Sequence, residues 1–273
     1  MDELELSSAN GDLDRLQELL GSEATNYLLA PSTLRRLLKS AISAKHAHVV
    51  EFLLDQNPSY RWWEDHEYNI VRNALSAGVN IFRALMARKP DIINWHLGFG
   101  QGTTVTAAVK DNNIELLLFL LANGAKAGEP DEPPGPPLLR AVQLDREDCV
   151  GILIPHCPLE CRVEALKYAV ANSRSLRMIQ LLVEAGTDVN YVLDPFSFYS
   201  LSMDTLDESA FHVAIRVRDE DSVRLFLEHG ADWNSCDAKG VPAKAKVLQQ
   251  GTDSPIFRIL SSSVGFLPSA ADN

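Results

Sequence analysis

Leu225-Phe226-Leu227-Glu228-His229-Gly230-Ala231-Asp232-Trp233-Asn234 is the stretch that decides the fold, because the chain repeats it. Residues 181–190 read Leu-Leu-Val-Glu-Ala-Gly-Thr-Asp-Val-Asn, and residues 120–125 read Leu-Leu-Ala-Asn-Gly-Ala. In each copy a run of apolar residues typical of a helix is followed by a glycine, and glycine readily adopts the left-handed conformation that ends a helix. Copies of one helix end predict a repeated structural unit.

The spacing of small residues gives the period of the repeat. Ala41 and Ala108 are 67 residues apart, Ala108 and Ala141 are 33 apart, and Ala141 and Ala214 are 73 apart. These intervals are two periods, one period, and two periods with a short insertion. A period of about 33 residues predicts stacked helix pairs, which are stable only together because one pair cannot bury its own apolar face.

Each predicted pair has an outer helix with apolar residues at i, i+3 and i+4, the spacing of one buried face. These sets are Leu16/Leu19/Leu20, Val50/Leu53/Leu54, Leu117/Leu120/Leu121, Val150/Leu153/Ile154, Ile179/Leu182/Val183 and Val223/Phe226/Leu227. The inner helix is short and carries small residues that allow close packing, namely Ala41, Ala107, Ala108, Ala141, Ala169 and Ala214.

The clearest copy opens with Ser209-Ala210-Phe211-His212-Val213-Ala214 and closes with Gly230-Ala231-Asp232-Trp233-Asn234. It resembles the ankyrin repeat, whose unit opens with Thr-Pro-Leu-His and closes with Gly-Ala-Asp-Val-Asn. Residues 104–108 and 137–141 resemble weaker openings. The resemblance implies an all-α solenoid of about seven to eight stacked helix pairs, with hairpin-like fingers along one edge. It also implies a structural role for His212 and partner binding through the fingers and the inner helices.

We expect a single ankyrin-repeat domain over 1–262 and a C-terminal tail over 263–273. The expected repeats lie near 2–22, 32–57, 66–90, 102–125, 136–156, 162–188, 208–232 and 240–260, with an insertion over 191–208. The first repeat is an acidic cap and the last is irregular. The third is one residue out of register.

The charge balance narrows the class of partner. There are 25 basic and 37 acidic residues, a net charge of −12, which argues against nucleic acid and against an anionic membrane surface. A basic or neutral protein partner suits this charge better. The N-terminus has no secretory pattern, and the longest apolar run, 116–122, is too short to span a bilayer. We expect a cytoplasmic monomer, with the nucleus as the alternative location.

Cysteine and glycine patterns predict no metal, no cofactor and no catalytic residue. The four cysteines form no disulfide framework, which favours a reduced compartment. The stretch His156-Cys157-Pro158-Leu159-Glu160-Cys161 offers at most three soft ligands, and we interpret it as a turn between repeats. No glycine-rich phosphate loop occurs in the sequence.

Aromatic residues at two expected fingers are the main candidate contacts. Two adjacent tryptophans, Trp62 and Trp63, precede Asp65 and His66, and both rings cannot point into one helix stack. The next finger carries Trp95 and His96, which would extend the same surface. Large aromatic side chains are enriched at binding hot spots. The alternative is that these rings pack between neighbouring fingers or inside a turn.

Three further departures from the repeat are candidates. The insertion carries Phe196, Phe198 and Tyr199, and it either folds over the concave groove, docks a partner or packs on its own repeat. Trp233, in the closing turn of the clearest copy, is a further candidate contact. The proline-rich stretch 129–137 favours a rigid connector.

Two functional classes remain open at this stage. The first is a protein-interaction adaptor that binds a partner through the concave groove and the finger loops and has no catalysis of its own. The second is a small-molecule binder or atypical enzyme, with a pocket walled by the finger and insertion aromatics. Its acid–base groups would be Asp65, His66, Glu67 and His96. Pocket geometry distinguishes the two.

Overall fold

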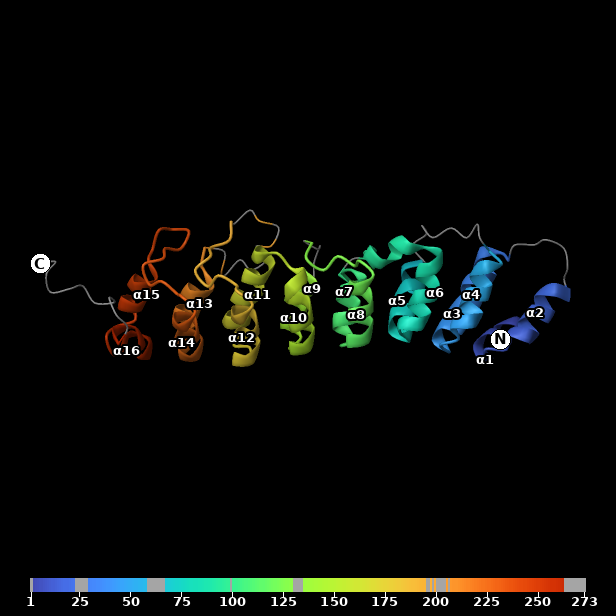
Figure 1. The fold of residues 1–273 in the computed structure, drawn as a ribbon, viewed down its shortest axis with the longest axis horizontal. Helices are drawn as coiled ribbons and strands as arrows, with labels where there is room; N and C mark the ends of the chain where they lie inside the picture. The colour runs from blue at the N-terminus through green and yellow to red at the C-terminus, as the bar shows by residue number, and fades with distance from the viewer. Residues whose placement is uncertain are drawn as a thin grey trace, which may run out of the picture. The chain divides into compact units, whose positions relative to one another are not determined.

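A computed structural model describes residues 2–22, 29–57, 67–98, 100–129, 135–194, 197, 199, 205 and 207–262. Its contacts divide the chain into two compact units, Met1–Lys126 (unit 1) and Ala127–Asn273 (unit 2), and each is described by itself (Figure 1). The single domain over 1–262 and the tail stay predictions.

Unit 1 contains four helix pairs in its described residues. The helices are α1 Glu3–Asn10, α2 Leu13–Ser22, α3 Pro31–Ser43, α4 Ala47–Asp55, α5 Glu67–Ala77, α6 Val79–Arg88, α7 Thr104–Lys110 and α8 Ile114–Ala122, with a short 3₁₀ helix, η1, at Pro90–Asn94.

Unit 2 also contains four helix pairs in its described residues. They are α9 Pro137–Gln143, α10 Glu147–Leu153, α11 Leu159–Ala171, α12 Leu176–Glu184, α13 Ala210–Val217, α14 Glu220–Glu228, α15 Ala243–Gln249 and α16 Pro255–Ser261, with the 3₁₀ helix η2 at Ile154–His156. Across the described ranges there is no strand, only two isolated bridges, so the predicted all-α class is confirmed. No helix in these ranges has both the length and the apolar character needed to cross a membrane.

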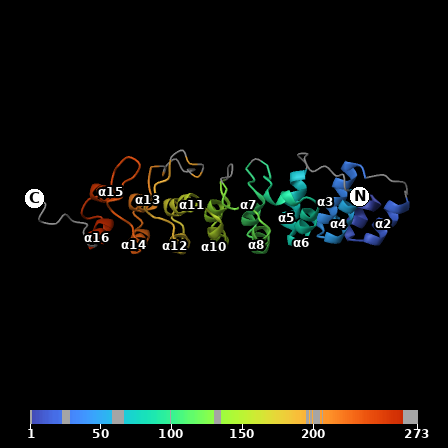
Figure 2. The same cartoon turned by 45° about the horizontal axis from the view of Figure 1, so that its top comes forward.

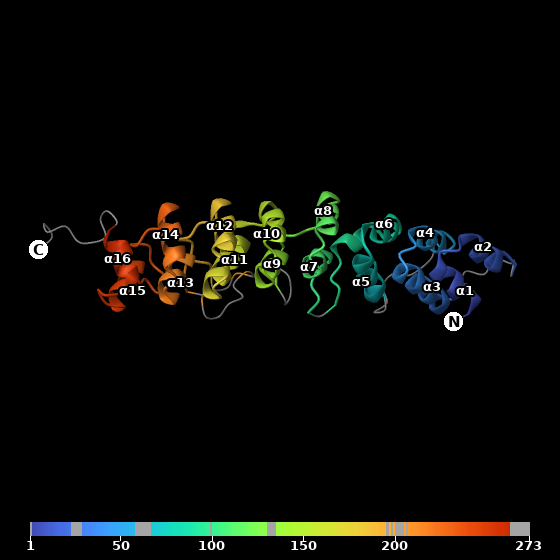
Figure 3. The same cartoon turned by 90° about the horizontal axis from the view of Figure 1, so that it is seen from below.

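Within each unit the odd-numbered helices form one layer and the even-numbered helices form another. In unit 1, α1, α3, α5 and α7 pack in sequence, and α4, α6 and α8 do the same behind them. In unit 2 the corresponding layers are α9, α11, α13 and α15, and α10, α12, α14 and α16. Figure 3 shows both layers in each unit. We call the odd-numbered helices inner helices and the even-numbered ones outer helices.

One residue with positive φ marks the turn inside every helix pair. These turn residues are Gly11, Lys45, Gly78 and Asn112 in unit 1, and Asp145, Ser173, Arg218 and Gly251 in unit 2. Positive φ is uncommon outside glycine, so its recurrence at one place in each pair shows that all pairs share one turn geometry. The turn residues therefore give a common register for the inner helices.

Within each unit this register places a row of mostly small residues. Four residues before the turn lie Ser7, Ala41, Ala74 and Ala108 in unit 1, and Ala141, Ala169, Ala214 and the larger Val247 in unit 2; all are buried. Ala74 is the member that the sequence series missed. The irregularity of the third pair lies in its turn, because Gly78 alone separates α5 from α6.

The predicted apolar faces of the outer helices form the core. Val50, Leu53, Leu120, Leu153 and Phe226 have almost no exposed surface. Each contributes about 1.5–3 kcal/mol by leaving water. Four members of the predicted sets are only half-buried, namely Leu19, Leu20, Leu121 and Leu227.

Two fingers are hairpin-like, as the resemblance implied. In unit 1, His96 pairs with Thr103, and the Leu97 amide donates to the Gly102 carbonyl at 2.9 Å. In unit 2, Cys236 pairs with Pro242. Figure 2 shows the unit 1 hairpin projecting past the end of α7. The pair α11–α12 has no such finger before it, because only Cys157 and Pro158 separate η2 from α11.

Candidate functional site

The unit 1 inner helices carry rows of polar residues at matching positions. Six residues before each turn lie the half-buried Glu5, the exposed Lys39, the half-buried Arg72 and the fully buried Thr106, and nine residues before lie Asp2, Arg36, Asn69 and Thr103. The ion pair between Arg36 and Asp2 joins neighbours in one row, as this register requires. We call the first set the Lys39 row.

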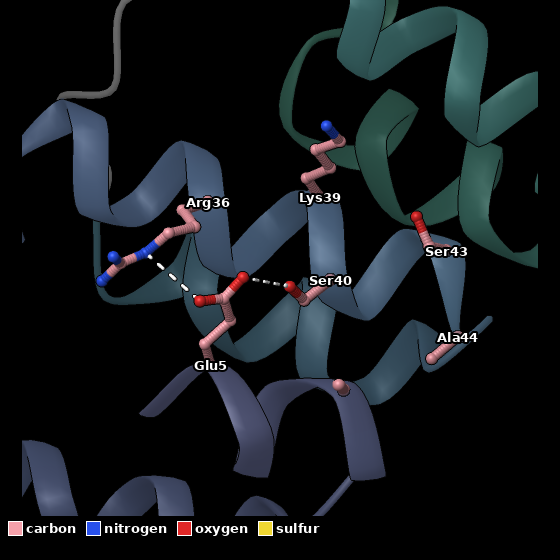
Figure 4. A pocket seen from close by; sticks show the side chains of 7 residues that line it. Glu5, Arg36, Lys39, Ser40, Ser43 and Ala44 are labelled. Atoms are coloured by element: carbon pink, nitrogen blue, oxygen red, sulfur yellow. Dashed lines mark hydrogen bonds and ion pairs between the residues drawn. The ribbon is translucent and has the colours of Figure 1, made fainter. Parts of the chain in front are cut away.

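A groove of about 470 Å³ opens between α1 and α3 (Figure 4). It is lined by Glu5, Ala9, Arg36, Lys39, Ser40, Ser43 and Ala44. Arg36 Nε lies 3.8 Å from a Glu5 carboxylate oxygen, and the Ser40 hydroxyl donates to the other oxygen at 3.4 Å. Arg36, which also pairs with Asp2, is thus shared between two carboxylates. Within the described part of the chain, Lys39 has no hydrogen bond or ion pair, and Figure 4 shows it pointing away from Glu5.

The same side of α5 and α7 is also polar. The Arg72 guanidinium donates to the Asn69 side chain one turn earlier. The Ser76 hydroxyl donates to an Asp111 oxygen at 3.3 Å. Lys110 Nζ donates to the Gly100 and Gln101 carbonyls at 3.3 and 3.0 Å, which holds the finger against α7. The inner side of unit 1 thus presents cations, amides and hydroxyls.

Trp95 lies at the finger edge of unit 1 in an aromatic pair with Tyr68. The rings meet edge to face with centroids 5.8 Å apart, and Tyr68 at the start of α5 is 37% exposed. Trp95 is half-buried, and its Nε1 donates to an Asp91 oxygen at 3.3 Å. Burial alone would raise the pKa of Asp91, but hydrogen bonds from Lys89 and Trp95 outweigh burial and lower it. The ring is thus oriented by a carboxylate and remains partly accessible.

His96 follows Trp95 and begins the finger hairpin. Its side chain is exposed, and its backbone pairs with Thr103. Tyr68 was not among the predicted contacts, although it ends the aromatic stretch 61–68 that contains Trp62 and Trp63.

Six of the predicted contacts lie outside the described residues. They are Trp62, Trp63, Asp65, His66, Phe196 and Phe198. The described contacts of that prediction are Trp95 and His96 in unit 1 and Tyr199 and Trp233 in unit 2.

Tyr199, from the insertion, reaches a finger of unit 2. Its hydroxyl donates to the Gly128 carbonyl at 2.6 Å, 71 positions earlier in the chain. Burial, followed by the nearby Cys161 and Glu160, raises the pKa of Tyr199 to about 12. This contact joins Tyr199 to a segment before α9, not to the repeat that precedes the insertion.

The cysteines close to Tyr199 are buried. Cys157 donates to the Ala127 carbonyl at 3.7 Å. A hydrogen bond with Cys157 and then burial raise the pKa of Cys161, which keeps its thiol protonated and unreactive. Among the residues that the structure describes, no group of three or more His, Cys, Asp or Glu side chains is placed to hold a metal.

A charged network, which the sequence analysis missed, joins the end of the insertion to α13, α15 and the last finger. Glu208 accepts from Arg216 Nε at 2.7 Å and from Lys246 Nζ at 2.8 Å, and Lys246 also contacts Asp237 at 2.8 Å. Burial alone would raise the pKa values of Glu208 and Asp237, but the hydrogen bonds from their cationic partners outweigh it and lower both. Next to this network, Lys239 contacts Asp207 at 2.7 Å.

Two of the unit 2 positions that match the Lys39 row are fully buried. Lys167 on α11 and His212 on α13 are both 0% exposed. Lys167 Nζ lies 3.5 Å from Glu164, and burial lowers the pKa of Lys167. His212 shares a hydrogen bond of 2.7 Å with the Ser209 hydroxyl at the start of α13, the structural role that the resemblance implied.

Trp233 lies half-buried in the closing turn after α14. Its carbonyl accepts from the Lys244 amide at 2.8 Å. The preceding turn is tied to it by Asn190, whose side chain donates to the Gly230 carbonyl at 2.9 Å and accepts from the Asp232 amide at 2.9 Å. These bonds hold the two consecutive turns together and account for Asn190 at the close of its copy.

A second cavity, of about 520 Å³, lies in unit 2 at the turns of α11–α12 and α13–α14, between Arg174 and Asp221. Neither it nor the α1–α3 groove has an aromatic ring in its lining. These two cavities therefore lack the aromatic walls that the small-molecule alternative predicted.

Comparisons with known proteins agree with the repeat architecture. The family model "Ankyrin repeats (3 copies)" matches residues 105–192, and the model "Ankyrin repeat" matches residues 207–238. The human ASB11 ankyrin repeat domain, a crystal structure, is similar at 19% sequence identity and a TM-score of 0.44, covering 94% of this chain and 96% of that chain. No curated protein matches the sequence.

Proposed function

Because the chain is an ankyrin-repeat protein, we propose that it acts as a protein-interaction adaptor that binds a partner through its inner helices and finger loops. Ankyrin repeats are in general protein–protein interaction modules, and stacked repeats present extended surfaces of this kind. The adaptor has no catalysis of its own, so any chemistry that follows binding belongs to the partner.

The observation that carries the proposal is the aromatic pair Tyr68–Trp95 beside the open inner face of unit 1. Both rings are partly accessible, and Asp91 holds the Trp95 ring in place, so little side-chain freedom is lost on binding. Aromatic side chains that are rigid before binding are typical hot spots. The inner helices α3 and α5 of the same unit also carry exposed hydroxyl, amide and cationic groups.

The remaining predicted contacts belong to the same proposal. Trp62 and Trp63 would extend the finger surface of unit 1, together with Asp65, His66 and His96. In unit 2, Phe196, Phe198, Tyr199 and Trp233 would form a second contact region. We also propose that the chain is a cytoplasmic monomer, which light scattering after size-exclusion chromatography and cell fractionation test directly.

Affinity purification from the native host, followed by mass spectrometry, tests the proposal. The wild type is compared with Tyr68→Ala/Trp95→Ala and with the control Leu118→Ala, which removes a 52% exposed apolar side chain from the outer helix α8. Circular dichroism confirms that each variant folds. A protein captured by the wild type and the control, but lost from the aromatic variant, supports the proposal. Equal capture by all three contradicts the assigned surface.

A further inference from the structure

The net negative charge is unevenly divided between the two units. Residues 1–126 contain 12 basic and 15 acidic side chains, whereas residues 127–273 contain 13 basic and 22 acidic ones. Unit 1 is therefore close to neutral, and local groups rather than the net charge of −12 decide what its inner face attracts.

Two cations occupy matching positions on neighbouring inner helices of unit 1. Lys39 on α3 and Arg72 on α5 each lie six residues before the turn residue, and these two helices pack against each other. The acidic member of the Lys39 row, Glu5, already has Arg36 and Ser40 as partners. Lys39 itself is exposed and has no partner among the described residues. The middle of the row thus carries uncompensated positive charge.

The two unit 2 residues of basic type at matching positions are closed to a partner. Lys167 and His212 have no exposed surface, and Lys167 already faces Glu164. A basic row on the inner helices is therefore accessible in unit 1 and not at the corresponding place in unit 2.

We infer that the partner presents an acidic, extended peptide segment, which lies across α3 and α5 with carboxylates on Lys39 and Arg72. The inference rests on the proposed function and names the chemistry of the partner. Packed helices are about 8–10 Å apart, and an extended chain advances about 3.3–3.6 Å per residue. Acidic residues at positions i and i+3 therefore match the separation of the two cations. This differs from the basic or neutral partner that the net charge favours.

The groups beside the Lys39 row suit the backbone of such a segment. One position further along, Ser40 on α3 and Asn73 on α5 lie next to the two cations, and Ser43 lines the same groove. Hydroxyl and amide side chains both donate and accept hydrogen bonds, as peptide N–H and C=O groups require. Lys39 and Arg72 then select acidic segments, while the contacts to the peptide backbone do not depend on its sequence.

Fluorescence anisotropy with the full chain tests the inference. The probe is a labelled peptide in which every glutamate is followed by two glycines, and the comparison peptide has glutamine in place of glutamate. At low ionic strength the glutamate peptide is expected to bind more tightly. Lys39→Ala/Arg72→Ala should weaken it about 3- to 30-fold, since each exposed ion pair contributes up to about 1 kcal/mol. The control, Lys45→Ala/Arg83→Ala, removes the same two charges from a turn and an outer helix of unit 1 and should change binding by less than about twofold.

Charge reversal gives an independent check. Lys39→Glu/Arg72→Glu should abolish binding of the glutamate peptide and favour a matching lysine peptide. Equal binding of the glutamate and glutamine peptides, or equal loss in the control variant, overturns the inference. A captured partner that is lost with Tyr68→Ala/Trp95→Ala but retained with Lys39→Ala/Arg72→Ala also overturns it, and leaves the proposed function standing. If no partner is captured, the proposed function fails, whatever the peptide result.

Discussion

Replacing Gly128 by alanine tests how the insertion and the finger of unit 2 are held. Gly128 has no left-handed φ, so its backbone does not itself demand glycine. A methyl group there would meet the His156 carbonyl oxygen well inside contact distance and the Pro158 Cδ at 2.9 Å. The obstacle is backbone rather than a flexible side chain. To remove this overlap, the backbone around Gly128 must move, and that backbone includes the carbonyl that Tyr199 contacts.

We expect Gly128→Ala to destabilise the protein by about 1–3 kcal/mol, the usual cost of inserting a methyl group into a packed site. The matched control is Gly151→Ala in α10, where a methyl group meets nothing within 4 Å. That change should stabilise by about 0.5–1 kcal/mol, because alanine loses less conformational entropy than glycine in a helix. Thermal unfolding measured by circular dichroism should move in opposite directions for the two variants, by roughly 2–4 °C per kcal/mol. A Gly128→Ala protein as stable as the wild type would refute the reasoning.

Three further results are expected from unfolding measurements. Leu153→Ala should lower the free energy of unfolding by about 2–5 kcal/mol, because it leaves a cavity in the core. Leu118→Ala, at an exposed site, should lower it by less than about 0.5 kcal/mol. Similar losses of stability in the two variants would contradict the assigned layers. Because the pKa of Glu208 is lowered in the fold, its charged form stabilises the protein above about pH 4.5, and this contribution is lost as the pH falls further. Glu208→Gln should therefore lose less stability than the wild type on acidification. Equal acid sensitivity of the two proteins would count against the Lys246 contact. Tyr199, with its pKa raised to about 12, stabilises the fold while it is neutral, so the stability of the wild type should fall as the pH rises above about 10. Tyr199→Phe should cost about 1 kcal/mol by itself and lose less stability at alkaline pH. Identical alkaline profiles would argue against the Gly128 contact.

The local pattern of the sequence was sufficient to predict the helix pairs. Apolar residues at i, i+3 and i+4 and the small residue before each turn depend on contacts inside one pair or with the next, so they repeat along the chain. Ala74 lies 33 residues after Ala41, one full period, and the sequence series passed over it. The register became clear only from backbone conformation, where Gly78 has the same positive φ as the other turn residues.

The candidate site was less accessible to sequence reasoning. Trp95 stands out by composition, but its partners Tyr68 and Asp91 are ordinary residues until the fold brings them together. Glu208 and Lys246 are 38 positions apart and meet only because the insertion returns to α13 and α15. Net charge is a sum over the whole chain, so it does not show that Lys39 is exposed and has no ionic partner among the described residues.

The most direct test of the account is hydrogen exchange of the chain with and without the captured partner. Binding through the inner helices and fingers predicts slower exchange in α3, α5 and the finger at 94–103, with little change in the outer helices α4 and α6. Protection confined to the outer helices, with α3, α5 and that finger unchanged, would contradict the account.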